Sequence, residues 1–228
     1  MSLQILGTSH IAQESLDRLS NAVEHYNPDI IAVELDLPRA QALLSEAKNR
    51  LSLRDIGSIG VVGFLFALLG QSLQQKLGKM VGLAPGSEMK QALLLAREKK
   101  IALALIDQPI RITLRNFSQA LTWKEKGRFI ADIFRGIFQG KKQLKKLGLE
   151  HLDLQKVPAP ELIEKMISQL KEHYPNIYKT LVEDRNKYMV RQLIKLMRSQ
   201  PEKKILCIVG AGHKKGMEEL LLKVDVVK

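Results

Sequence analysis

The chain has 228 residues, of which 45% are hydrophobic and 26% charged, enough for one sizeable α/β core with or without a helical excursion. Its formal net charge of +12 favours anionic partners. It contains one cysteine, Cys207, which excludes a framework of internal disulfides and fits a reducing compartment.

The first fifth of the chain predicts strand, helix, strand and helix in turn. Residues 3–6 and 30–34 are apolar runs, which are typical of parallel strands covered on both faces. Residues 11–25 carry apolar side chains at helical spacing, and so do residues 38–50, which Pro38 can open.

Residues 56–70 contain no charged side chain. These 15 residues are fewer than the roughly 20 that a helix needs to cross a bilayer. We expect a buried or dimer-forming helix, and the alternative is a segment that inserts into a membrane or lies on it. Because such a segment needs cover, it also predicts a homo-oligomer.

The remaining elements complete an α/β pattern. We expect helices at 85–99, 113–137, 158–174, 176–198 and 214–222, and strands at 101–106 and 204–209. The simplest organisation is one α/β domain over residues 1–228, with a mostly parallel central sheet flanked by helices. It would carry a helical insertion at about 50–85 and helical additions at about 113–200.

Basic residues concentrate between Lys124 and Lys146, where eight Lys or Arg stand against two acidic residues. An apolar stripe over residues 129–138 predicts an amphipathic helix there, packed on the core with a solvated basic face. The alternative is a helix that binds an anionic membrane surface or a partner protein. The stretch lacks interleaved exposed aromatics and any known nucleic-acid module, which argues against nucleic-acid binding.

A short signature occurs near both ends of the chain: Gly7-Thr8-Ser9-His10 and Gly210-Ala211-Gly212-His213. Each follows a predicted strand, and glycine lets the backbone turn sharply there. In a parallel sheet both histidines would lie beyond the carboxyl ends of strands, where such sheets bind ligands. We therefore expect His10 and His213 to face one pocket.

Charged residues follow the other two strands. Glu34 closes the second strand and Arg39 comes soon after it, while Asp107 closes the third and precedes Arg111 and Arg115. A cap or a turn would explain any one of them. Because all four predicted strands are followed by a histidine or a charged residue, a functional site is favoured instead. A buried charge is costly unless it is paired or bound.

Further polar residues come from a long helix, where Glu183 and Arg185 could line the same pocket from above.

The combined pattern resembles the TraB/PrgY family of pheromone-shutdown proteins, a group related to the Tiki metalloproteases, GumN-like proteins and erythromycin-esterase-like hydrolases. The residues that carry the resemblance are the two signatures, Val33-Glu34-Leu35-Asp36 with Arg39, Gly86-Ser87-Glu88-Met89, Asp107 with Arg115, Glu183-Asp184-Arg185 and Gly216. It implies an α/β fold with paired Gly-x-x-His turns and a key glutamate.

The first functional hypothesis is a metal-dependent hydrolase, most plausibly peptidase-like. His10 and His213 would ligate a divalent ion, and Glu34 would ligate it or act as general base on a bound water, whose pKa the metal lowers toward roughly 7. In a metal-free variant, which the esterase-like relatives suggest, His10 and Glu34 activate water directly. The expected catalytic residues are Glu34, His10, His213, Arg39, Arg115 and Glu183; the expected substrate contacts are Gly7, Gly210, Gly212, Glu88, Asp107, Arg111 and Arg185.

The second hypothesis is a non-catalytic regulator that binds a peptide or another anionic ligand, as the pheromone-shutdown name suggests. Its arginines would hold a carboxylate or phosphate without breaking a bond. Under either hypothesis the partner is a peptide or a small anionic molecule. Because no signal peptide is evident, we expect a cytoplasmic protein, or one attached to the cytoplasmic side of a membrane.

Overall fold

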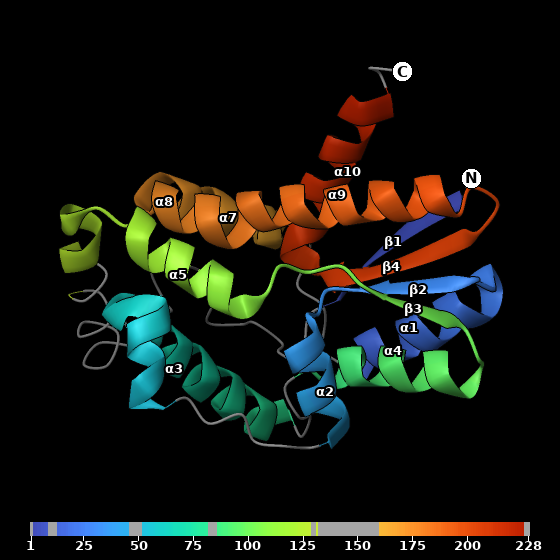
Figure 1. The fold of residues 1–228 in the computed structure, drawn as a ribbon, viewed down its shortest axis with the longest axis horizontal. Coiled ribbons are helices and arrows are strands. Elements are labelled where there is room, and N and C mark those ends of the chain that lie inside the picture. The colour runs from blue at the N-terminus through green and yellow to red at the C-terminus, as the bar shows by residue number, and fades with distance from the viewer. Residues whose placement is uncertain are drawn as a thin grey trace.

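The computed structural model describes residues 2–8, 13–45, 52–81, 86–128, 131 and 160–225. Its centre is a four-stranded sheet with the order β1-β4-β2-β3, in which the three strand pairings are parallel (Figure 1). The strands are β1 (Ser2–Thr8), β2 (Ile30–Val33), β3 (Ala102–Leu105) and β4 (Lys204–Gly210). Thr8 pairs with Gly210, so the first and last strands end side by side. The predicted α/β fold is confirmed.

Helices cover both faces of the sheet (Figure 1). Along β2, Ile31 and Val33 pack into the core with α1 and α4, whereas Ile30 and Ala32 pack into the core with α9 and α10. This burial on both faces explains why the central strands β2 and β4 are apolar at almost every position. The four helices are α1 (Gln13–Tyr26), α4 (Ser87–Glu98), α9 (Asp184–Ser199) and α10 (Ala211–Asp225).

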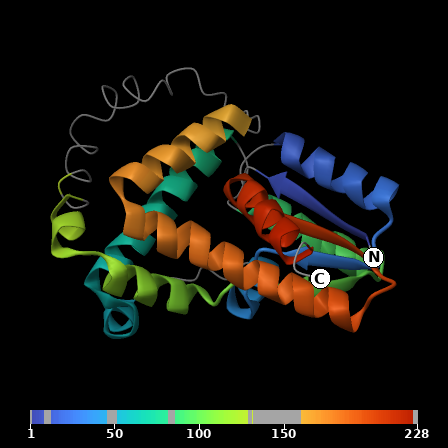
Figure 2. The ribbon, with the colours of Figure 1, turned by 90° about the horizontal axis from the view of Figure 1, so that it is seen from above.

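The other helices extend to one side of the sheet, as the view from above shows (Figure 2). Phe117 is fully buried there, in a cluster with Leu121 and Ile177. The elements are α2 (Leu37–Ser45), a 3₁₀ turn (Leu53–Asp55), α3 (Ile56–Val81), α5 (Ile110–Ala120), α7 (Pro160–His173), α8 (Pro175–Tyr178) and a π-helical turn (Lys179–Glu183) that joins α8 to α9.

The uncharged segment 56–70 lies in α3 and packs against α5. Gly63 makes the close contact possible, because a Cβ there would lie 2.7 Å from the carbonyl oxygen of Leu114. Ile59 and Phe64 are buried, but Val61 is 58% exposed. Among the described residues, no helix is both long enough and apolar enough to cross a bilayer. A dimer and a membrane contact at this segment both stay predictions.

The mostly helical stretch predicted over 113–137 is interrupted near its middle. α5 ends at Ala120, and Leu121 has an extended backbone before residues 123–128 become helical. Thr122 and Glu125 explain the restart, since the Thr122 backbone N–H and hydroxyl donate to the Glu125 carboxylate and the Glu125 N–H donates to Thr122 Oγ1. Most of the basic stretch 124–146 and the apolar stripe lie outside the described residues.

Glu125 also ties this restart to α8, because its carboxylate accepts a hydrogen bond of 2.7 Å from the Asn176 side chain. Burial raises the pKa of Glu125, but the hydrogen bonds from Asn176 and Thr122 lower it by more than burial raises it. The pKa of Glu125 therefore lies below its ordinary value. The ionised form is thus the one that the fold stabilises.

We expect Glu125→Gln to lower the free energy of unfolding by about 1 kcal/mol at pH 7. Because the folded-state pKa is depressed, the contribution is complete above the unfolded value of about 4.3 and disappears as the pH falls through the folded value. Urea denaturation at pH 7 and pH 3 measures it. The control is Glu98→Gln at an exposed site. If Glu125→Gln lowered the free energy of unfolding by the same amount at pH 7 and pH 3, the stabilising role of the ionised Glu125 carboxylate would be contradicted.

Candidate functional site

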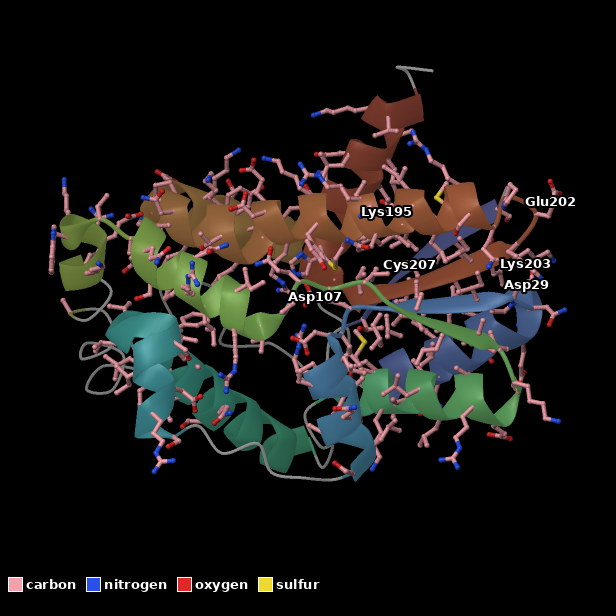
Figure 3. All side chains as sticks on the ribbon, in the orientation of Figure 1. Asp29, Asp107, Lys195, Glu202, Lys203 and Cys207 are labelled. Carbon is pink, nitrogen blue, oxygen red and sulfur yellow. The ribbon has the colours of Figure 1, made fainter. Side chains whose placement is uncertain are left out.

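Three strand ends and two helices bring charged side chains together at the carboxyl edge of the sheet. Glu34 directly follows β2, Asp107 follows β3, and His213 lies in the first turn of α10, which starts where β4 ends. Arg185 reaches them from the first turn of α9. Figure 3 labels Asp107 where the sheet meets α5 and α9. Glu34, Asp107 and His213 are all buried, so the cluster is a desolvated one.

Arg185 is the centre of this cluster. Its Nε and Nη2 donate to Oδ1 and Oδ2 of Asp107 at 3.1 and 2.7 Å, and Nη2 also donates to Glu34 Oε1. Its Nη1 lies 3.0 Å from His213 Nε2. Burial alone would lower the pKa of Arg185, but the charges of Glu34 and Asp107 raise it above its usual range. The guanidinium therefore stays positive and holds both carboxylates.

Glu34 faces both a helix N-terminus and the imidazole. Its Oε2 accepts a hydrogen bond of 2.6 Å from the Gly210 backbone N–H, immediately before α10. Its Oε1 lies 3.4 Å from His213 Nε2. The positive end of the α10 dipole stabilises a carboxylate at this place. The ionised carboxylate of Glu34 is thus oriented beside the ring.

A second arginine supports Asp107. Arg39 Nη2 donates to Asp107 Oδ2 at 2.5 Å, while its backbone N–H and Nε donate to Asp36 Oδ1. Asp36 Oδ2 accepts from the Ile110 backbone N–H at 2.6 Å, which joins the turn after β2 to the start of α5. Arg39 therefore lies at the cluster, as predicted, but in contact with two carboxylates.

Some predicted site residues lie elsewhere. Arg111 is exposed and pairs with Asp55 at 3.0 Å, and Arg115 is exposed on α5. Glu183 pairs with Lys187 at 2.5 Å, and its side chain is 41% exposed. Two residues along a helix point in directions about 200° apart, so Glu183 and Arg185 do not share one face. Among the described residues, Arg111 and Glu183 thus pair outside the Arg185 cluster, and the roles of Arg111, Arg115 and Glu183 in the site stay predictions.

The predicted glycines and Glu88 have varied surroundings. Gly7 packs closely on α10, since a Cβ there would lie 3.3 Å from Ala211 Cα. Gly212 is in the first turn of α10, where a Cβ would lie 3.5 Å from Ile167 Cδ1, an ordinary van der Waals contact. Gly210-Ala211-Gly212-His213 therefore starts a helix at once and forms no separate turn. Glu88 is buried in the first turn of α4, after Gly86 with its positive φ of 77°.

His10 lies outside the described residues, so the predicted meeting of the two histidines stays a prediction. The adjacent ends of β1 and β4 support it, because His10 follows Thr8 by two residues. Within the described ranges, no three His, Cys, Asp or Glu side chains gather closely enough to hold a metal. Glu34 and His213 both contact the Arg185 guanidinium, a positive group that a cation would have to displace. The described part of the donor set therefore does not fit a divalent ion.

The sequence reasoning missed two features beside Arg185. One is the π-helical turn Lys179–Glu183, a rare form that often occurs at functional sites. The other is Asn186, which is buried with its Oδ1 2.7 Å from His213 Nδ1. An asparagine inside a helix, next to a candidate site residue, is the signal that could have identified it. Cys207 lies fully buried in β4, and burial raises the pKa of its thiol, consistent with a core residue.

Comparisons with known proteins extend over nearly the whole chain. The model of the TraB/PrgY/gumN family matches residues 2–224. An uncharacterized protein of Methanocaldococcus jannaschii is 32% identical over 98% of this chain and 54% of its own length. The human TraB domain-containing protein is 24% identical over 94% of this chain and 61% of its own. The chain thus spans a little over half of these relatives.

Among solved structures, an erythromycin esterase mutant in its open conformation matches with 15% identity and a TM-score of 0.34. The match covers 91% of this chain and 60% of that one.

Proposed function

The chain belongs to the TraB/PrgY/gumN family, and we propose that it is a hydrolase whose reaction centre is the buried cluster of Glu34, His213 and Arg185. The observation that carries the proposal is the Glu34 carboxylate, held 3.4 Å from an imidazole nitrogen and against a guanidinium. Three segments far apart in the sequence supply these groups. Acid, base and cation in one desolvated place are what hydrolysis of a carbonyl compound needs.

The burial of so many charges supports a functional role. Glu34, Asp36 and Asp107 are each at most 6% exposed. Removing a carboxylate from water costs several kcal/mol even when a partner recovers part of it, and apolar side chains of similar size usually stabilise a core at least as well. Ionisable groups gathered in this way are more frequent at sites of chemistry than in structural cores.

We assign roles from the contacts. Glu34 accepts a proton from a water molecule as the water oxygen attacks the carbonyl carbon of the substrate. Arg185 stabilises the negative charge that develops on the carbonyl oxygen. The proton then passes to the leaving nitrogen or oxygen as its bond to carbon breaks. His213 lies beside the Glu34 oxygen and takes part in this proton transfer.

The proposal takes the metal-free form, because Arg185 already supplies a positive charge next to both Glu34 and His213. For the substrate we propose a peptide or a small anionic molecule, since the net charge of +12 attracts anions. Binding of such a ligand without turnover, which is the regulator hypothesis, is a distinct outcome of the experiment below.

Glu34→Gln is expected to reduce turnover at least about 100-fold, because the amide cannot accept the proton. The assay uses a panel of fluorogenic peptides and nitrophenyl esters with purified protein, whose metal content is measured by elemental analysis. The matched control is Glu164→Gln, which removes an exposed carboxylate paired with Lys215 at 2.7 Å.

Three results would contradict the proposal. One is equal turnover by wild type and Glu34→Gln. Another is ligand binding by wild type without hydrolysis of any member of the panel. Stoichiometric metal that is lost on His10→Ala together with activity would replace the metal-free form with the metal-dependent one.

A further inference from the structure

Both ring nitrogens of His213 are held by neighbouring residues of one helix. Arg185 Nη1 lies 3.0 Å from Nε2, and Asn186 Oδ1 lies 2.7 Å from Nδ1. We infer that Asn186 is a positioning residue, which holds His213 as the neutral tautomer with its proton on Nδ1 and its Nε2 lone pair toward Arg185 and Glu34. The inference rests on the proposed function for its catalytic meaning, but its geometry does not.

The hydrogen-bonding capacities of the partners determine the tautomer. A guanidinium has only donors, so the 3.0 Å contact with Arg185 is a hydrogen bond when Nε2 accepts, whereas the Glu34 carboxylate, 3.4 Å from the same atom, favours a proton on Nε2. The partner of Nδ1 decides between the two arrangements, and an acceptor at Nδ1 selects the first. The proton of a neutral ring then lies on Nδ1, where it needs an acceptor. The Asn186 amide oxygen is that acceptor, and the contact is buried. Without it, the N–H of Nδ1 would lose this hydrogen bond inside the protein.

Gly216 provides the space that Asn186 occupies. It lies one helical turn beyond His213 on α10, and a Cβ at this position would lie 2.4 Å from Asn186 Nδ2. No side chain atom fits there unless the amide moves. The three residues therefore form one unit. His213 and Gly216 on α10 supply the imidazole ring and the space beside it, and Asn186 on α9 fills that space and hydrogen-bonds the ring.

An amide and a carboxylate would have different effects at position 186. A carboxylate on Nδ1 stabilises the positive imidazolium, as an aspartate does in a catalytic triad. An amide oxygen orients the ring without adding a charge. Because Arg185 is already positive at Nε2, a neutral partner on Nδ1 keeps the imidazole neutral. His213 is then ready to accept a proton at Nε2 when a substrate displaces the Arg185 contact.

The ¹⁵N spectrum of the histidine side chains at neutral pH tests the inference without any substrate. His213 is assigned by the signal that His213→Gln removes. In wild type we expect a pyrrole-like shift at Nδ1 and a pyridine-like shift at Nε2. Asn186→Asp should make both nitrogens pyrrole-like, and Asn186→Leu should replace the single-tautomer pattern with averaged shifts. Gly216→Ala should reproduce the Asn186→Leu spectrum, because it displaces the amide.

Matched controls separate positioning from a general loss of structure. Asn176→Leu removes an amide of the same kind, which donates to Glu125 at 2.7 Å, and should leave the His213 signals unchanged. Gly212→Ala adds a methyl group to the same helix in ordinary contact, with the same expectation. His25 and His173, whose Nδ1 atoms bond to backbone carbonyls, are internal references in every spectrum.

Wild-type His213 with a proton on Nε2, or spectra that Asn186→Asp and Asn186→Leu leave unchanged, would overturn the inference. Those results would leave the role of Glu34 intact. Conversely, a Glu34→Gln variant with full turnover would refute the proposed function and leave the tautomer assignment standing.

Discussion

Arg185→Met is expected to lower the free energy of unfolding by about 3–5 kcal/mol, because it leaves Glu34 and Asp107 buried without the cation that both contact. The methionine fills part of the volume but can neutralise neither carboxylate. The Arg185 side chain is 14% exposed, so water compensates little. Urea denaturation followed by far-ultraviolet circular dichroism at pH 7 measures the loss.

Two further variants give reference values for this loss in the free energy of unfolding. Arg111→Met removes an exposed ion pair with Asp55 and should cost less than about 1 kcal/mol. Arg185→Lys keeps the charge but loses the planar fork that contacts both Asp107 oxygens, so its stability should fall between those of wild type and Arg185→Met. If Arg185→Met unfolded at the wild-type urea concentration, the cluster would not depend on this guanidinium.

Phe117→Ala is expected to cost about 3–5 kcal/mol, through the cavity that it opens between α5, α3 and α8. Phe117 is fully buried, and its ring centroid lies 4.6 Å from that of Phe66 in a tilted arrangement. These contacts join the helical side of the molecule into one core. Thermal unfolding followed by circular dichroism measures the shift of the midpoint.

Trp123→Ala is the matched control, since it removes an even larger ring that is 87% exposed. Its packing with Lys126, 4.8 Å from the ring centroid, contributes less than about 1 kcal/mol at such an exposed site. A Phe117→Ala variant as stable as Trp123→Ala would show that the helical side of the molecule is loosely packed.

The sheet could be predicted from the sequence because its apolar runs have a simple cause. The runs 30–34 and 204–209 are apolar at nearly every position, and the cores on both faces of β2 and β4 account for this. Charged side chains directly after such runs then indicated the carboxyl edge of the sheet, where Glu34 and Asp107 do lie.

The helices were harder to predict, because side chains decide where each helix stops. The break at Leu121 depends on two hydrogen bonds between Thr122 and Glu125: the Thr122 hydroxyl donates to the Glu125 carboxylate, and the Glu125 backbone N–H donates to the hydroxyl oxygen. The apolar spacing of the sequence continues through this break. The π-helical turn adds a residue to one turn, which the helix predicted over 176–198 does not anticipate.

Charge alone could not distinguish the arginines of the buried cluster from the exposed ones. Arg111 and Arg115 come shortly after the end of a strand, as a site residue was expected to do. Arg185, which contacts Asp107, lies instead on a helix 78 residues further along the sequence. Such long-range pairing arises from the packing of α9 on the sheet.

The position of β4 has a consequence for synthesis on the ribosome. This strand is made after β1, β2 and β3, yet it lies between β1 and β2 and bonds to both. Until residues 204–210 have left the exit tunnel, the nascent chain can pair β2 with β3, whereas β4, the strand that pairs with β1 in the described sheet, is still missing. The β1 strand must therefore keep an open edge while about 200 further residues are synthesised, an interval in which a chaperone that shields such edges would act.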